Sequence, residues 1–254
     1  MIKTIFQDQS ILVIEKVPGL ITISDSSTVE TLASLIERDF GIKPSVSIVH
    51  RLDKDTSGVM VIAKTVSAHD NLQNQFKDRQ VKKEYLALVH GTVEKGGIID
   101  VNITRNPADS TKFITVSSGV FDNEGRVAAT EYEPVERLQF TGDRLQEIFS
   151  DLRKTELQKL STNHYNLYTL LKCHPLTGRT HQIRVHLKYI NHPIVSDADY
   201  AGRRTYRLDT RWCPRQFLHA AKLGFYHPES GEWTEFDSPL PDDLKKALNK
   251  LTNE

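Results

Sequence analysis

Short aliphatic and β-branched runs alternate along this 254-residue chain with stretches whose apolar residues recur at helical spacing. Residues 11–14 and 59–63 are apolar runs of the kind that predicts strands. Residues 67–80 instead place Ala68, Leu72 and Phe76 four positions apart, which predicts an amphipathic helix. The pattern therefore favours a fold that mixes strands and helices.

The remaining elements follow from the same patterns and from turn residues. Pro18 and Gly19 favour a turn before a second short strand, and Ser27 with Glu30 has the spacing of a capping box for a helix that ends at Gly41. Further strands are expected at residues 20–23, 47–49, 84–89, 112–116, 128–135, 167–173 and 216–227. Further helices are expected at residues 180–190 and 242–251, and the polar stretch 141–163 is expected to be a peripheral helical insertion without an assigned role.

Composition limits the class of protein. The chain balances 33 Lys and Arg against 33 Asp and Glu, so overall charge does not predict a nucleic-acid partner. Any such prediction must rest on local basic clusters, each of which either binds phosphate or is an ordinary solvated face: residues 77–83 and the set Arg203, Arg204, Arg207, Arg211 and Arg215. Cys173 and Cys213 are far apart, which argues against a disulfide framework or a structural zinc site and favours a reducing compartment. No apolar run approaches the roughly 18 residues of a membrane span.

Three polar segments carry the chemistry. Residues 50–58 place Asp53 and Asp55 in a hairpin, where aspartates also occur as plain turn formers. Residues 178–186 are unusually basic around Ile183, so Arg184 lies either toward a cleft or on a solvated helix face. Residues 83–89 place Tyr85 on a strand, either in a site or as an ordinary half-buried tyrosine.

Together these segments closely resemble the RluA-type pseudouridine synthases. The family pattern contains His-Arg-Leu-Asp-x-x-Thr-Ser-Gly, Lys-x-Tyr-x-Ala, and Gly-Arg-Thr-His-Gln-Ile-Arg-Val-His, which this chain matches in order at residues 50–58, 83–87 and 178–186. Agreement continues at residues 191–195, 218–220 and 239–244, so the resemblance covers about residues 11–248. It implies an α+β pseudouridine synthase fold, with a mixed, mainly antiparallel sheet, flanking helices and a central RNA-binding cleft in one catalytic domain over residues 1–254.

The resemblance also implies roles for individual residues. Asp53 matches the catalytic aspartate, Tyr85 the active-site tyrosine, and Arg184 the basic partner of the aspartate. An arginine favours the ionised form of a carboxylate and holds it bidentately, and a tyrosine ring can stack on uracil for about 1–3 kcal/mol. The target uridine must be flipped out of its stack, and Arg51 is expected either to fill the gap or to contact a phosphate. Other substrate-binding residues are expected to be His50, Leu52, Arg179, His181, Ile183, Arg203 and Arg207.

We accordingly expect a cytoplasmic, monomeric enzyme that acts on structured ribosomal or transfer RNA, without a membrane, metal or cofactor. Many relatives carry an N-terminal RNA-binding domain of the S4 type, whereas the pattern here begins near residue 11, so RNA is expected to be selected by the catalytic domain and its insertions. The family also usually has glycine where this chain has Ser196.

Two alternatives remain open. Asp53-Lys54-Asp55-Thr56 fits the Asp-x-Asp-x-Thr pattern of Mg²⁺-dependent aspartyl phosphotransferases, although His50 and Arg51 interrupt the apolar strand that this pattern requires before its first aspartate. The other alternative is a catalytically inactive RNA-binding protein of the same fold. The histidines do not favour a metal site, because His181 and His186 lie five positions apart and no His-Glu-x-x-His spacing exists.

Overall fold

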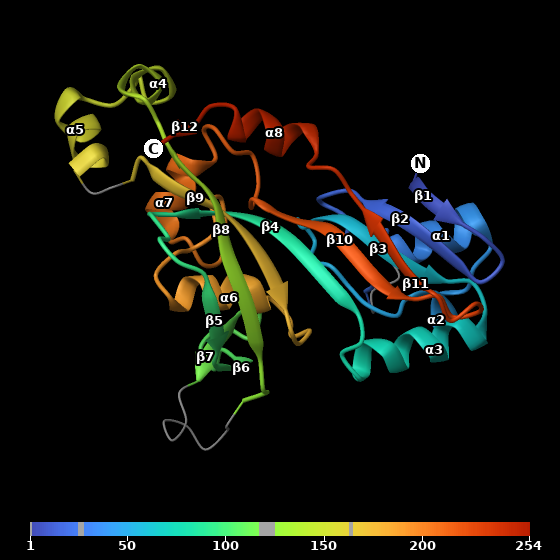
Figure 1. Ribbon diagram of the computed structural model, residues 1–254. Helices are drawn as coiled ribbons and strands as arrows, with labels where there is room; N and C mark the ends of the chain where they lie inside the picture. The colour runs from blue at the N-terminus through green and yellow to red at the C-terminus, as the bar shows by residue number, and fades with distance from the viewer. Residues whose placement is uncertain (1, 25–27, 117–124, 163–164) are drawn as a thin grey trace. The chain divides into compact units, whose positions relative to one another are not determined.

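The computed structural model describes residues 2–24, 28–116, 125–162 and 165–254 (Figure 1). The chain divides into two compact units: the first unit is Met1–Tyr85 with His219–Leu240, and the second unit is Leu86–Leu218 with Pro241–Glu254. Strands β4 (Lys82–His90) and β10 (Leu218–Tyr226) contribute residues to both. The predicted α+β class and the mainly antiparallel strand pairing are confirmed, while the single catalytic domain stays a prediction.

A mixed sheet forms the centre of the first unit. Its strands are β1 (Lys3–Gln7), β2 (Ile11–Lys16), β3 (Ser57–Ala63), β10 and β11 (Trp233–Asp237). All neighbouring pairs are antiparallel except β3 with β10, which run parallel. The helices are α1 (Leu32–Phe40), α2 (Pro44–Ser47) and α3 (Val66–Lys77).

Both faces of this sheet are buried at β2 and β3. Successive side chains of a strand point to opposite faces, so neighbouring residues pack on different sides. Ile11 of β2 packs in a cluster with Leu72 of α3, whereas its neighbour Leu12 packs in a second cluster with Ile36 of α1. A strand covered on both faces needs apolar residues at every position. This burial explains why residues 11–14 and 59–63 are continuous apolar runs.

Gly58 lies opposite Ala220, where the parallel strands β3 and β10 pair. Its φ is +127°, and a Cβ on it would lie 2.6 Å from the backbone nitrogen of Ala220. We therefore expect Gly58→Ala to lower the free energy of unfolding by about 2–4 kcal/mol, since backbone cannot yield as a flexible side chain can. Gly142→Ala is the control, because a Cβ there meets nothing within 4 Å. Urea unfolding measures both changes, and equal midpoints for Gly58→Ala and wild type would refute the expectation.

The second unit contains an antiparallel sheet and a separate hairpin. The sheet strands are β5 (Gly97–Asp100), β8 (Ala129–Gln139), β9 (Leu167–Pro175) and β12 (Thr252–Asn253), and the hairpin strands are β6 (Asn102–Arg105) and β7 (Phe113–Val116). The helices are α4 (Gly142–Ile148), α5 (Lys154–Thr162), α6 (Gln182–Tyr189), α7 (Arg203–Asp209) and α8 (Asp242–Leu248). Helices α4 and α5 confirm the helical character predicted for residues 141–163 (Figure 1).

Two predicted strands are wrong. Residues 20–23 form only an isolated bridge from Ile21 to Thr31. Of residues 47–49, Ser47 ends the short helix α2, whose first residue, Pro44, favours a helix start, and Ile48 forms only an isolated bridge to Ile62. The predicted capping box is also displaced. Thr31 and Ser34 form it, while Ser27 lies outside the described residues.

Two further observations concern burial and membranes. Cys173 and Cys213 are buried free thiols. Within the described ranges, no helix combines the length and apolar composition needed to cross a bilayer.

Candidate functional site

Leu52, which precedes Asp53 in the same loop, holds this loop against the core of the first unit. The Leu52 side chain is buried in the apolar cluster that also contains Ile36. The hydroxyl of Thr22 accepts from the Leu52 backbone N–H at 3.3 Å and donates to the Leu52 carbonyl at 2.8 Å. Residues 20–23, predicted as a strand, thus support this loop instead.

A buried lysine binds the backbone of the same loop after Asp53. The Lys16 side chain is 1% exposed, and its ammonium donates to the carbonyl oxygens of Lys54 and Thr56, each at 2.9 Å. The Thr56 N–H donates to the carbonyl of Asp53 at 3.2 Å, which closes the turn. Asp53 is therefore a half-buried carboxylate on a loop whose backbone is fixed on both sides.

The structure brings Tyr85 close to Asp53 within the first unit. Tyr85 lies on β4 and packs against the same cluster as Leu52. Burial raises the pKa of Tyr85, and the nearby negative charge of Asp53 raises it further. The phenol is therefore protonated at neutral pH, so it can donate a hydrogen bond.

His50 acts as a support within the first unit. Its Nε2 accepts from the backbone N–H of Val61 at 3.1 Å, and its ring stacks on Phe76 with centroids 4.6 Å apart. Burial, with a contribution from the charge of Lys83, lowers the pKa of His50 to about 3. The imidazole is therefore neutral at physiological pH. Its predicted contact with substrate stays a prediction, as does that of Arg51, which is exposed.

Lys83, for which the sequence predicted only a general phosphate contact, lies close to His50. It is half-buried, and burial lowers the pKa of its ammonium group to about 8. A lysine with such a pKa is charged at neutral pH and loses its charge in mildly alkaline solution.

The Lys83 pKa predicts a pH-dependent stability difference. Below pH 8 the folded and unfolded states both carry the proton, and burying the charge costs stability. Between pH 8 and the ordinary value of 10.5, the folded state loses its proton first, so wild type gains stability. We expect Lys83→Met to raise the free energy of unfolding by about 1–2 kcal/mol at pH 7, and to lose this advantage by about pH 10.5.

Urea unfolding at the two pH values tests this expectation. Lys82→Met is the matched control, because Lys82 is exposed, and it should change the free energy of unfolding by less than about 0.5 kcal/mol at either pH. A difference between Lys83→Met and wild type that does not depend on pH would contradict the burial argument.

In the second unit, Arg184 is buried on α6 and held by two carboxylates. Its side chain is 6% exposed; Nε and Nη2 donate to the two carboxylate oxygens of Asp197 at 2.7 and 2.8 Å, and Nη2 donates to Asp199 at 2.6 Å. The guanidinium also lies over the ring of Tyr200, 5.0 Å from its centroid. The alternative of a solvated helix face is therefore wrong. Sequence reasoning missed both carboxylates.

The turn before Asp197 depends on an unusual backbone conformation. Ser196 has φ +57°, the left-handed region that favours glycine, at the position where the resembling family has glycine. Two hydrogen bonds hold it there, from its N–H to Asp209 at 2.9 Å and from its hydroxyl to the Cys213 carbonyl at 2.6 Å. The turn thus forms without glycine.

Gln182 fixes the Gly178–Thr180 loop that precedes α6. Its side-chain oxygen accepts from the Thr177 hydroxyl at 2.6 Å and from the Arg179 N–H at 2.9 Å. Its side-chain nitrogen donates to the Ala129 carbonyl and the Thr130 hydroxyl on β8, at 2.9 and 3.0 Å. The amide therefore uses both its donors and its acceptor, and it clamps the loop to β8.

The other predicted substrate residues of the second unit differ in exposure. Ile183 is buried, and His181 lies at the start of α6 with Nδ1 3.0 Å from the Tyr200 hydroxyl. Arg203 and Arg207 are exposed on α7. Arg211 and Arg215, expected in the same basic cluster, instead form bidentate ion pairs with Asp151 and Asp243.

Comparisons with known proteins identify relatives over nearly the whole chain. A family model described as RNA pseudouridylate synthase matches residues 10–189. Proteins named ribosomal large subunit pseudouridine synthase D are 36% identical in Nitrosomonas europaea and 35% in Xanthomonas campestris, over 99% and 98% of this chain. The chain spans 66% and 69% of the length of these two relatives. The solved structure of human RNA pseudouridylate synthase domain containing 1 has a TM-score of 0.73 and 25% identity, over 100% of this chain and 89% of that one.

Proposed function

Because this chain belongs to the RNA pseudouridylate synthase family, we propose that it isomerises a uridine of ribosomal RNA to pseudouridine. One observation carries the proposal: Asp53 lies next to the half-buried, protonated Tyr85, on a loop that Lys16 and Thr22 hold through its backbone, within the residues that match the family. The names of the relatives favour RNA of the large ribosomal subunit over transfer RNA. We extend the proposal to a monomer that acts in the cytoplasm.

The proposed reaction conserves the composition of the nucleotide, with one proton exchanged. The bond from N1 of uracil to C1′ of ribose breaks, the base turns, and C5 bonds to C1′; the proton on C5 leaves and N1 gains one. Asp53 would begin the reaction, either by attack on C1′ or by removing the C2′ proton. Tyr85 would hold the uracil against its ring, and its hydroxyl is available for proton transfer.

Arg184 is proposed, from the family motif, as the guanidinium partner that keeps Asp53 ionised and oriented. Its ion pairs with Asp197 and Asp199 support this role because they fix the guanidinium plane. Arg51, Arg203 and Arg207 are proposed contacts to RNA, and their exposure is compatible with that role.

Release of tritium tests the reaction directly. A transcript of large-subunit ribosomal RNA made with [5-³H]uridine should release tritium to water when the chain is added, since only bond formation at C5 expels that proton. The release should continue in EDTA. Phosphatase activity that requires Mg²⁺, without tritium release, would instead support the aspartyl phosphotransferase. RNA binding without release from any ribosomal or transfer RNA would support the inactive RNA-binding protein.

A further inference from the structure

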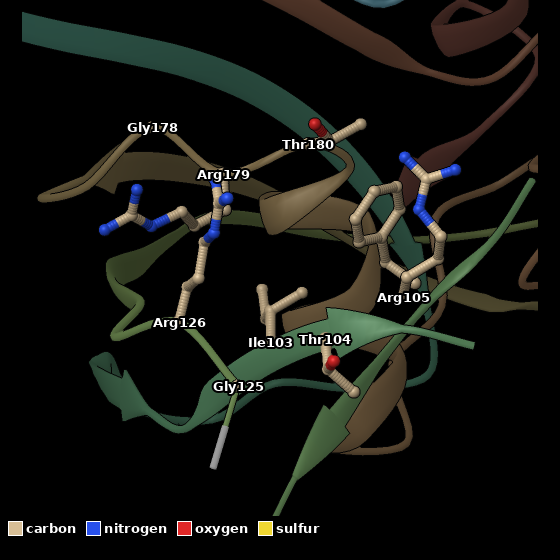
Figure 2. A pocket seen from close by; sticks show the side chains of 9 residues that line it. Ile103, Thr104, Arg105, Gly125, Arg126, Gly178, Arg179 and Thr180 are labelled. Carbon is tan, nitrogen blue, oxygen red and sulfur yellow. The ribbon is translucent and has the colours of Figure 1, made fainter. Parts of the chain in front are cut away.

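A pocket lined by three arginines lies within the second unit, apart from the residues assigned above to catalysis. Its volume is about 340 Å³, and its lining includes Arg105 at the end of β6, Arg126, and the Gly178–Thr180 loop. Arg126 and Arg179 extend along one side of the pocket and Arg105 lies on the other side (Figure 2). Three guanidinium groups thus surround one concavity.

Among the described residues, these arginines differ from other arginines of the unit in their ion pairs. Arg144, Arg211 and Arg215 each form an ion pair with an acidic side chain. Across the described ranges, by contrast, no ion pair joins Arg105, Arg126 or Arg179 to a carboxylate. Guanidinium groups held around one pocket repel one another, and an anion within it would remove that repulsion.

Hydrogen bonds within the protein hold the walls of the pocket in place. Arg179 is placed by the Gln182 clamp, and its Nε donates to the carbonyl of Val127 at 3.0 Å. The backbones of Arg126 and Ile103 exchange hydrogen bonds of 3.0 and 2.8 Å, which fixes one wall. Binding an anion there would therefore require little ordering of the backbone, which favours affinity.

The size and lining of the pocket favour a nucleotide over a free ion. A volume of about 340 Å³ is at the small end of ligand pockets. Ile103 and Phe113 add apolar surface beside the cations, and the Arg105 guanidinium already lies over the Phe113 ring at 5.5 Å. A phosphodiester with its sugar and base combines a charge for the arginines with faces for the apolar wall.

We propose that this arginine pocket (Arg105, Arg126 and Arg179) binds one phosphodiester of the RNA substrate, at a nucleotide other than the target uridine. The proposal rests on the proposed function for the identity of the RNA. A short chain of contacts joins the pocket to Arg184, because Tyr200 lies under the Arg184 guanidinium and its hydroxyl accepts from the Phe113 N–H at 3.0 Å. RNA held in the pocket would thus contact the structure that orients Arg184.

The test uses the full chain, with both Arg105 and Arg126 changed to Gln. Both side chains are exposed, so the fold should survive. A labelled transcript of large-subunit ribosomal RNA should bind the double variant about tenfold more weakly at 0.1 M salt. The slope of log affinity against log salt should fall by about 1 to 2. The turnover rate at saturating RNA should stay close to that of wild type.

Arg144→Gln is the matched control, because Arg144 is an exposed arginine already paired with Glu147. It should leave affinity and salt slope unchanged. Phosphate-ethylation interference on the same transcript should lose one or two adjacent positions in the double variant and none in Arg144→Gln. Unchanged affinity in the double variant, or an equal loss in Arg144→Gln, would overturn the pocket assignment.

The failure of this proposal and that of the proposed function can be separated. If wild type releases tritium and the double variant binds RNA normally, the pocket assignment fails and the proposed function stands. If no RNA releases tritium but the interference pattern changes as expected, the pocket binds RNA phosphate and the proposed isomerisation fails.

Discussion

Replacing Asp53 by Asn should reduce tritium release by at least about 10⁴-fold while RNA affinity changes little. The substitution keeps the size of the side chain and removes the charge and basicity that either mechanism requires. The loop should keep its shape, because Lys16 and Thr22 hold it through hydrogen bonds to its backbone carbonyls, which the substitution leaves in place. Single-turnover release and filter binding on the same transcript measure the two effects.

Asp55→Asn is the control for this prediction. Asp55 is exposed two residues further along the same loop, and it should lose less than about tenfold in rate. An equal loss in both variants would revive the paired-aspartate phosphotransferase. Substantial turnover by Asp53→Asn would remove Asp53 from the catalytic role.

Arg184→Met should abolish turnover and also lower the free energy of unfolding, by about 3–5 kcal/mol. The second effect follows from the structure, since the variant leaves Asp197 fully buried without its bidentate partner. Arg184→Lys keeps the charge but loses the planar fork, so its turnover and stability should be intermediate. RNA affinity and its salt slope should change little in both variants once they are folded at low temperature.

Arg207→Ala separates this role from phosphate binding. Arg207 is exposed on α7, so its loss should weaken RNA binding, lower the salt slope by about 1 and preserve turnover at saturating RNA. If Arg184→Met instead lowered the salt slope and preserved both stability and turnover, the proposed partnership with Asp53 would be withdrawn.

Local sequence patterns predicted the elements whose burial follows a regular pattern along the chain. Residues 59–63 and 67–80 became β3 and α3 because a covered strand and an amphipathic helix leave clear periodicities. Residues 20–23 have similar composition but form no strand; instead the Thr22 hydroxyl binds the backbone of Leu52, far along the chain. That contact leaves no local trace in the sequence.

The sequence did not predict the contacts made by Lys16, Asp197 and Asp199, because the partners of these residues lie in distant segments of the chain. Lys16 at the end of β2 resembles an exposed lysine until the carbonyls of the Asp53 loop surround it. Asp197 and Asp199 resemble turn formers, and only the left-handed Ser196 turn aims them at Arg184. The arginine pocket combines residues of a hairpin, a bridge and a loop. The motif resemblance predicts roles for Asp53, Tyr85 and Arg184, but it does not predict the contacts that hold these residues in place.

Mapping pseudouridine in ribosomal RNA from cells that lack the gene tests the central claim most directly. The proposed function predicts that one or a few uridines of the large-subunit RNA lose their modification. A copy that encodes wild type should restore it, and a copy that encodes Asp53→Asn at equal abundance should not. An unchanged pseudouridine profile without the gene, or full restoration by Asp53→Asn, would contradict the account.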